Sequence, residues 1–359
     1  MTVQWVAVSA KTGVVICDLP GLSVASIGSM MCAYSTTEAT LLVDDSTNPA
    51  WLEGTLPGGA MLVCLDGDSP LWGGLVTKRI RQPNAPVRLS LVTPEAYMDR
   101  RYVTVDTVIT GEDQNTITET LVDTFVGDTF PITVDVEASA VTRDRTYRAA
   151  ADKSIYSALV ELAGVINGNE WVIGWVASTV DDQQAYVPVL TVADSLGTSP
   201  NEGMAPAVTF EYPGVVASFT YSEDYSAASG ANDVLAVSTA IEDVRPESDH
   251  ALYVDAFRPT FEYRYTPSQG ISDTDTLDDH AEATVARMGT GAIGLAMTVN
   301  YGTAPKPGVD WVIGDVVGFV VTAPEFPDGI SGTARVRGWS LKLGETPVLE
   351  PFLTEVTLA

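Results

Sequence analysis

The fold is decided by residues 56–91, which read LPGGAMLVCLDGDSPLWGGLVTKRIRQPNAPVRLSL. Two apolar runs, 60–65 and 71–77, are separated by a turn of Asp and Gly at 66–68. Residues 87–91 then alternate apolar and polar side chains, as a strand with one buried face does. Three such strands joined by turns predict an antiparallel β-meander.

A similar strand pattern returns near the other end of the chain. Apolar and polar side chains alternate from Trp339 to Leu343, but the phase slips against Val336. Because an extra residue in one strand produces such a slip, we predict a β-bulge at Gly338.

Helical periodicity is confined to a few segments. Three segments have a clear helical period. Asn115 is the predicted N-cap of the first, and Gly164 and Gly289 are the predicted stops of the second and third. The predicted helices cover residues 115–126, 152–163 and 274–288, with one shorter helical turn at 94–101.

Strands therefore come in blocks with helices between them, which predicts an α+β fold with mainly antiparallel sheets. We expect an N-terminal β-barrel-like domain at 1–100, a mixed insert with two helices at 101–205, and a second β-rich domain with one helix at 206–359. The polar loop 194–206 is the candidate linker.

The composition excludes several classes of protein. With 47 acidic against 19 basic residues the net charge is −28, which argues against a direct grip on nucleic acid. A hydrophobic content of 45% excludes wholesale disorder, and no apolar run is long enough to span a bilayer. The N-terminus has no basic leader, so no export is expected. The acidic bias has two readings, a halophilic or GC-rich source or a surface that repels polyanions.

Three cysteines, Cys17, Cys32 and Cys64, lie in apolar contexts without CxxC spacing. We interpret them as buried free thiols of a protein folded in a reducing compartment, with neither a disulfide nor a metal site expected.

Motifs for chemistry are weak throughout the sequence. Residues 289–294 match GxGxxG, but a predicted helix precedes them and a strand-like run follows, the reverse of a dinucleotide site. His250 and His280 lack catalytic or zinc-binding spacing. The acid pairs are expected at turns and helix starts, and they lie at 44–45, 66 and 68, 181–182, 273 and 275, and 278–279. We therefore assign no catalytic, cofactor-binding or metal-ligating residues, and predict that the protein is not an enzyme.

Basic residues gather in two groups, which leaves two interpretations open. They could pair with acidic patches on a neighbouring copy of the chain, or form exposed ion pairs of ~0–1 kcal/mol within one copy. The groups are Lys78, Arg79, Arg81, Arg88, Arg100 and Arg101, followed by Arg143, Arg145, Arg148 and Lys153.

Several stretches together resemble the minor tail proteins, or tail (baseplate) hub proteins, of long-tailed bacteriophages, particularly of actinobacterial phages. None of these stretches carries a catalytic signature. They are residues 5–13 (WVAVSAKTG), 18–20 (DLP), 56–59 (LPGG), 72–74 (WGG), 94–102 (PEAYMDRRY), 314–315 (GD) and 339–344 (WSLKLG).

The resemblance implies a tail-hub-like structural protein of the virion tail tip, made and assembled in the host cytoplasm. It implies a homotrimer whose two barrels per subunit form a pseudo-sixfold ring that continues the tail tube and lines the DNA exit channel. The implied partners are the distal tail protein, the tape measure protein and other tail-tip or receptor-binding proteins. Neither a cofactor nor a specific nucleic-acid site is implied, and DNA would only pass through the lumen.

Two other functions remain open at this point. One is a glycoside hydrolase of the host cell wall that uses a pair of carboxylates. The other is a carbohydrate-binding adhesin in which Trp51, Trp72 or Trp175 stacks on sugar rings, although tryptophans in β-domains more often belong to the core.

Overall fold

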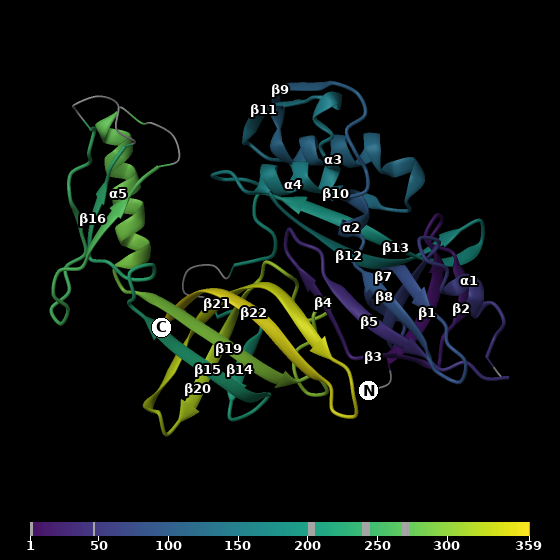
Figure 1. Ribbon diagram of the computed structural model, residues 1–359. Coiled ribbons are helices and arrows are strands. Elements are labelled where there is room, and N and C mark those ends of the chain that lie inside the picture. Colours follow the sequence, from purple (N-terminus) through teal and green to yellow (C-terminus); the bar gives the residue numbers. More distant parts are fainter. Residues whose placement is uncertain are drawn as a thin grey trace. The chain divides into compact units, whose positions relative to one another are not determined.

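The structure is a computed structural model that describes residues 3–45, 47–199, 205–238, 245–267, 271 and 273–358, apart from the side chain of residue 128 (Figure 1). The chain divides into two compact units. Unit 1 comprises Met1–Ser218 with Met297–Ala359, and unit 2 comprises Phe219–Ala296. Each unit is described by itself.

The first sheet of unit 1 contains seven strands that pair antiparallel throughout. The predicted meander is confirmed as its three consecutive strands β6, β7 and β8. A short helix, α1 (Trp51–Gly54), precedes them and was not expected from the sequence. The strand order is β2 (Val15–Asp18), β1 (Val3–Ser9), β6 (Ala60–Asp66), β7 (Ser69–Ile80), β8 (Val87–Val92), β5 (Thr36–Leu41) and β3 (Leu22–Val24).

The second sheet of unit 1 is built in a similar way. Its first strand pairs parallel with the second strand, and the next three neighbouring pairs are antiparallel. The strand order is β14 (Thr209–Tyr212), β20 (Val316–Ala323), β21 (Phe326–Lys342), β22 (Val348–Leu358), β19 (Ala292–Asn300) and β15 (Val216–Asp224). Strands β15 and β19 cross the division of the chain, so their residues 219–224 and 292–296 belong to unit 2.

Both sheets are curled in the same way, by a short connection between their two edge strands. In the first sheet the two terminal strands, β2 and β3, are consecutive in the chain and are joined only by residues 19–21. In the second sheet residues 213–215 join the terminal strands β14 and β15. Because a residue spans at most ~3.6 Å, the two edges of each sheet lie within roughly 14 Å of one another where the connection runs. Each sheet must therefore bend toward a barrel.

Between these sheets in sequence lies a mixed segment with its own three-stranded sheet. Helices α3 (Gln114–Phe125) and α4 (Ile155–Ala163) cover one face of this sheet, while β9 (Thr107–Asp113) and β11 (Thr142–Tyr147) form a separate ribbon (Figure 1). One hydrophobic core runs from this segment into the first sheet. The sheet order is β10 (Thr133–Val136), β13 (Gln183–Ala193) and β12 (Glu170–Val180), and the short helices are α2 (Glu95–Met98), η1 (Gly127–Thr129) and η2 (Ala149–Ala151).

The helix starts differ from the sequence prediction at two places. The carboxylate of Asp113, not the side chain of Asn115, caps α3 by accepting hydrogen bonds from two backbone N–H groups of the first turn. Asn115 is buried and its amide donates to the carbonyl of Glu137. Helix α4 begins at Ile155 behind a Ser154 cap, since the preceding residues form η2 and its left-handed end. The stop at Gly164 is confirmed.

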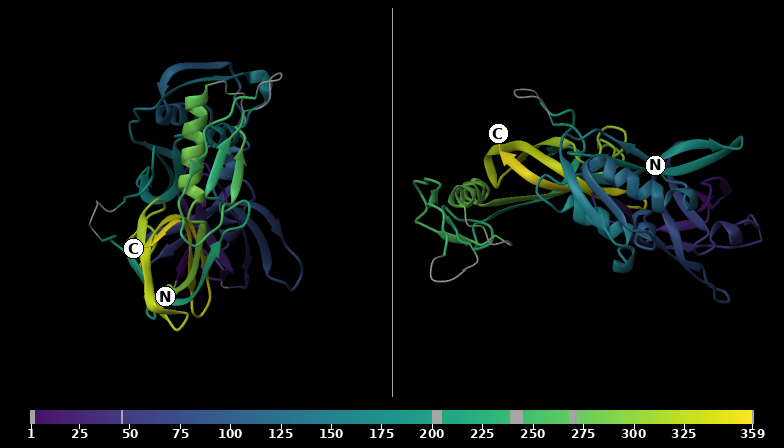
Figure 2. Two further views of the ribbon diagram at one scale, coloured as in Figure 1. Left: turned by 90° about the vertical axis from the view of Figure 1, so that its left-hand side faces the viewer. Right: turned by 90° about the horizontal axis from the view of Figure 1, so that it is seen from above.

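Unit 2 packs one helix, α5 (Thr274–Met288), on a three-stranded sheet (Figure 2). The bounds of α5 and its stop at Gly289 are as predicted. The glycines of the 289–294 motif end this helix and lead into β19, so no helix follows them. The sheet order is β17 (Ala251–Leu252), β16 (Asp233–Ala236) and β18 (Glu262–Tyr265).

Candidate functional site: the junction of the two curled sheets

One long strand, β21, links the two curled sheets. Strand β21 pairs with β20 over its first part, and its last five residues pair with β4 (Ser26–Met30), which follows the first sheet's strand β3 directly in the chain. The register shifts between Val336 and Gly338, so the predicted bulge is confirmed and it marks the point where β21 changes partner. A Cβ atom at Gly338 would lie 2.7 Å from the carbonyl oxygen of Ser29, which leaves room only for glycine.

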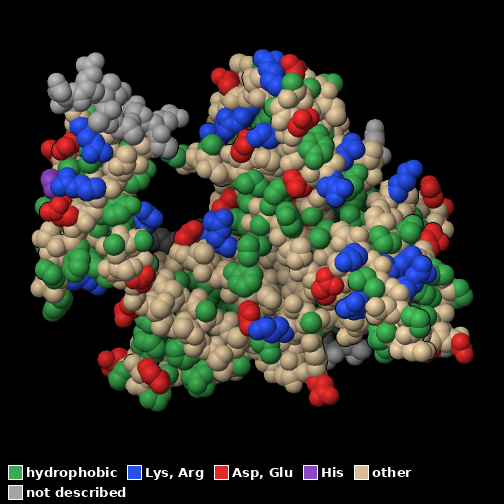
Figure 3. Space-filling view, viewed as in Figure 1, with side chains coloured by type: hydrophobic (Ala, Val, Ile, Leu, Met, Phe, Trp, Pro, Cys, Tyr) green, Lys and Arg blue, Asp and Glu red, His purple; other side chains and the backbone are tan. Residues whose placement is uncertain are grey.

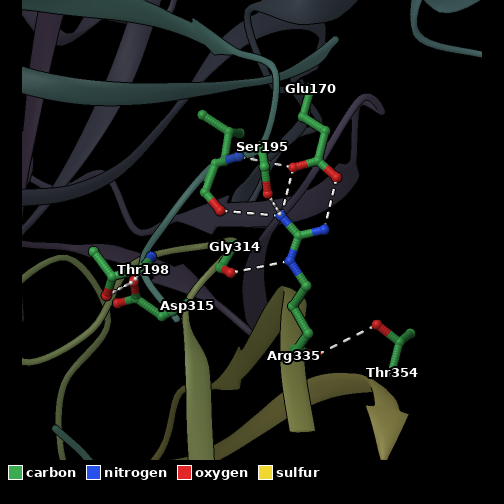
Figure 4. A network of polar contacts seen from close by, with 8 residues as sticks. Glu170, Ser195, Thr198, Gly314, Asp315, Arg335 and Thr354 are labelled. Atoms are coloured by element: carbon green, nitrogen blue, oxygen red, sulfur yellow. Dashed lines mark hydrogen bonds and ion pairs between the residues drawn. The ribbon is translucent and has the colours of Figure 1, made fainter. Parts of the chain in front are cut away.

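Beside this strand, Arg335 of β21 forms a partly buried ion pair with Glu170 of β12 (Figure 4). The two guanidinium nitrogens Nη1 and Nη2 donate to Glu170 Oε1 and Oε2 at 2.7 and 2.6 Å. The same guanidinium donates to the carbonyls of Leu196 and Gly314 and to the hydroxyl of Ser195. Hydrogen bonding to Glu170 raises the pKa of Arg335 above its usual value. The network therefore links the insert to the second sheet by directional contacts.

Two glycines allow the backbones to meet next to this ion pair. Gly197 and Gly314 both have positive φ angles, +74° and +103°, and a Cβ on either would lie 2.2 Å from backbone atoms of the opposite segment. Asp315 fixes the contact further, because its carboxylate accepts hydrogen bonds from the backbone N–H and the hydroxyl of Thr198. Residues 194–198 of the predicted linker are thus held in place, and residues 200–204 lie outside the described part of the chain.

A second ion pair joins the first sheet to the loop that follows β19. Lys306 Nζ lies 2.5 Å from Asp66 Oδ2, and the Tyr301 hydroxyl donates to the same oxygen at 3.0 Å. Burial, reinforced by the charge of Asp66, raises the pKa of Tyr301. One member of the predicted acid pair 66 and 68 is therefore a structural contact between sheets.

These contacts surround a cavity of about 700 Å³ inside unit 1. All three parts of the unit contribute to its wall, including a tryptophan from each: Trp72 of the first sheet, Trp175 of the insert and Trp339 of the second sheet. Trp72 is buried and donates its indole N–H to the carbonyl of Gly28, while Trp175 packs over Gly73. Trp72 is therefore a core residue and is not available to stack on a sugar.

One buried carboxyl group, Glu95 of α2, also lines the cavity. Burial raises the pKa of Glu95 to about 7, although hydrogen bonds with Thr93 and the backbone oppose the shift. Its Oε2 atom lacks a hydrogen-bond partner. A carboxyl with this pKa is protonated in about half of the molecules at neutral pH, whereas an ordinary glutamate is almost fully ionised there.

Members of two other acid pairs and both histidines have local structural roles. Asp181 and Asp182 form the turn of the β12–β13 hairpin with positive φ angles, and Asp273 caps α5. His250 pairs with Asp233 in unit 2, where the ring of His280 lies against Tyr265. Within the described residues, no group of three or more His, Cys, Asp or Glu side chains is arranged to hold a metal ion.

The three cysteines are free thiols, and Cys17 and Cys64 are buried while Cys32 is half-buried. Burial raises the pKa of all three, to about 11 for Cys32 and about 12 for Cys64. The thiolate, which is the reactive form, is therefore scarce at neutral pH.

Several of the basic residues are used within the chain. Arg79 donates to the carbonyl of Leu52, Arg101 to that of Phe125, and Arg143 to those of Ile166 and Asn167. Arg148 and Lys153 pair with Asp106 and Glu161. The interpretation as intramolecular ion pairs is confirmed for Arg148 and Lys153, whereas the other three residues donate to backbone carbonyls of the same chain. In the space-filling view, acidic and basic side chains are interspersed over the visible face of unit 1 (Figure 3).

Across the described part of the chain, no helix combines the length and the apolar character needed to cross a membrane.

Three solved structures of tail proteins share this fold over nearly their whole length. The 43 kDa tail protein of prophage MuSo2 from Shewanella oneidensis superposes with a TM-score of 0.59 at 9% identity, covering 98% of both chains. A tail protein from Neisseria meningitidis MC58 gives 0.55 at 12% identity, covering 98% of this chain and 96% of its own. Prophage tail protein gp18 from Listeria monocytogenes EGD-e gives 0.51 at 7% identity, covering 97% and 94%.

No protein-family model and no curated protein matches the sequence. The fold is therefore shared with tail proteins, two of them from prophages, and the narrower likeness to proteins of actinobacterial phages stays a prediction from the sequence.

Proposed function

We propose that this chain is a structural subunit of a phage tail tip, a hub whose copies close into a trimeric ring around the path of the DNA. The observation that carries the proposal is the fold itself, shared over 97–98% of the chain with three tail proteins. The proposal includes a division into a β-barrel-like domain at 1–100, a mixed insert at 101–205 and a second β-rich domain at 206–359. It also includes the distal tail protein, the tape measure protein and receptor-binding proteins as neighbours of this chain in the tail tip.

The arrangement of unit 1 supports a ring. In each of its two curled sheets a short connection joins the two edge strands, and β21 links the two sheets to each other. Three copies would supply six such sheets, which matches the sixfold symmetry implied by the resemblance to tail hubs. Closure of a ring would also cover strand edges that a single copy leaves unpaired.

The net charge supports passage of DNA without adhesion. A chain with 47 acidic and 19 basic residues repels phosphate, and that repulsion extends over about a Debye length of ~8–10 Å at physiological salt. We expect acidic side chains to line the lumen, so that DNA moves through without forming lasting contacts.

The test is the mass and symmetry of the assembled protein. We expect native mass spectrometry to give three times the 38.1 kDa mass of the chain, and negative-stain images to show a ring with a central hole. A chain that remains monomeric at high concentration and is absent from purified virions would contradict the proposal. Release of reducing sugar from host cell wall would favour the hydrolase instead.

A further inference from the structure

One surface of unit 2 is apolar in a way that the rest of the unit is not. Residues 252–261, named here the apolar loop, carry five exposed large hydrophobic side chains: Leu252, Tyr253, Val254, Phe257 and Phe261. Phe257 and Val254 are 96% and 91% exposed, the highest values for large hydrophobic side chains among the described residues. Side chains of this kind are usually covered in the working state of a protein.

The apolar loop is held rigidly at its base. Asp255 accepts a hydrogen bond from the backbone N–H of Phe257 at 2.7 Å and forms an ion pair with Arg258. The guanidinium of Arg258 lies 4.5 Å from the ring centroid of Tyr225. Asn232 donates to the carbonyl of Pro259 and accepts from the backbone N–H of Phe261. A loop fixed in this way loses little conformational entropy when a partner binds it.

The charge of the unit indicates what kind of partner fits. Phe219–Ala296 contains fourteen Asp and Glu residues against four Arg, a net charge of −10. Within the apolar loop the only charged residues are Asp255 and Arg258, and these neutralise each other. A basic partner would be attracted to the acidic surface of unit 2 outside the apolar loop. An acidic partner would be repelled by that surface, so it requires a contact patch without net charge.

We propose that the apolar loop is the surface by which unit 2 contacts a second copy of this chain. A second copy carries a charge of −28, so copies repel one another except where apolar side chains meet. The inference rests on the proposed assembly and adds to it a specific contact. Phe257 and Val254 would act as the anchor of a larger interface, since one loop does not supply the ~800 Å² per partner of a standard interface.

Salt dependence follows directly from this charge pattern. Added salt screens the repulsion between like-charged copies and leaves apolar contacts intact. The association constant of the wild-type protein should therefore rise between 50 and 500 mM NaCl in sedimentation equilibrium. A fall over the same range would show that attraction between opposite charges holds the copies together, and would overturn the inference.

Substitution of the anchor residue provides the second test. We expect Phe257→Ala to raise the dissociation constant about tenfold to hundredfold, because burial of one such side chain contributes that much, and Phe257→Asp to weaken association further. The matched control is Ala283→Asp on the exposed face of α5, which adds the same charge to the same unit and should change the constant less than about threefold. Far-UV circular dichroism would verify that all variants fold.

A photocrosslink identifies the partner. Benzoylphenylalanine is placed at position 257, and the labelled chains are mixed with isotopically heavy wild-type chains before irradiation. Crosslinks between light and heavy chains support the inference, whereas crosslinks within a single chain alone overturn it. If the wild type forms a ring and Phe257→Asp keeps the same mass, the inference fails while the proposed function stands. If the wild type stays monomeric, both fail.

Discussion

Replacing Arg335 by methionine should destabilise unit 1 strongly. The side chains of Arg335 and Glu170 are 12% and 16% exposed, so the substitution leaves a partly buried carboxylate whose remaining hydrogen-bond donor is the backbone N–H of Leu196. Removal of one partner of a fully buried pair costs about 3–5 kcal/mol, and residual contact with water lowers that cost. We therefore expect Arg335→Met to lower the free energy of unfolding of unit 1 by about 2–4 kcal/mol.

The assay can be confined to the unit that contains the pair. All seven tryptophans of the chain lie outside residues 219–296, so tryptophan emission during urea unfolding reports on unit 1 alone. The control is Lys342→Met in the pair Lys342–Glu350, where the side chains are 61% and 28% exposed and the expected cost is ~0–1 kcal/mol. The difference between the variants should persist in 0.5 M NaCl, because salt screens a buried pair little.

The double variant Arg335→Met with Glu170→Met separates the charge from the packing. It leaves only neutral groups without partners, so its cost should be about 1–3 kcal/mol, well below the sum of the two single substitutions. A cost below about 1 kcal/mol for Arg335→Met, or strict additivity of the two changes, would refute the reasoning that this pair acts as one buried unit.

Three further outcomes are expected. Burial raises the pKa of Glu95 to about 7, so the contribution of Glu95 to the free energy of unfolding is complete below pH ~4.5 and falls by about 3 kcal/mol as the pH rises to ~7. In urea titrations at pH 5 and 8, the variant Glu95→Gln should lose this pH dependence. Equal losses of stability with pH in the variant and the wild type would contradict the prediction. Gly197→Ala should cost about 3 kcal/mol by the same tryptophan assay, whereas Gly344→Ala, which meets no neighbouring atom, should unfold at the wild-type urea concentration. Cys32 and Cys64 should not react with Ellman's reagent at pH 8 until urea unfolds unit 1, and rapid reaction in the native protein would show that these thiols are accessible.

Features set by neighbouring residues could be predicted from the sequence. The meander 56–91 was predictable because its turn residues and its alternation of apolar and polar side chains are features of the local sequence. Helix α5 was predictable because its apolar period, the acid in its first turn and the stop at Gly289 all indicate the same helix. The bulge at Gly338 was visible as a slip in alternation. The cap of α3 was misplaced by two residues, since Asp113 and Asn115 are both good caps and only tertiary contacts decide between them.

The junction could not be predicted in the same way. Glu170 and Arg335 are separated by 165 residues, and nothing in the pattern around either residue identifies the other. The pairing of β4 with β21 was equally hidden, because alternation shows that a segment is a strand but does not name its neighbour. Glycines such as Gly197 and Gly314 resemble ordinary loop glycines until the opposite backbone is in place.

The polar character of the junction has a consequence for assembly. Apolar burial stabilises without fixing direction, whereas the bidentate pair of Arg335 with Glu170 and the close approach of Gly197 to Gly314 hold the insert at a defined angle to the second sheet. The insert shares a hydrophobic core with the first sheet, so these contacts also fix the angle between the two curled sheets. A ring of identical copies closes only if that angle repeats in every copy. We therefore expect the double methionine variant to fold but to give a wider distribution of masses by native mass spectrometry than the wild type. A single sharp trimer mass for both proteins would show instead that strand pairing through β4 and β21 alone sets the angle.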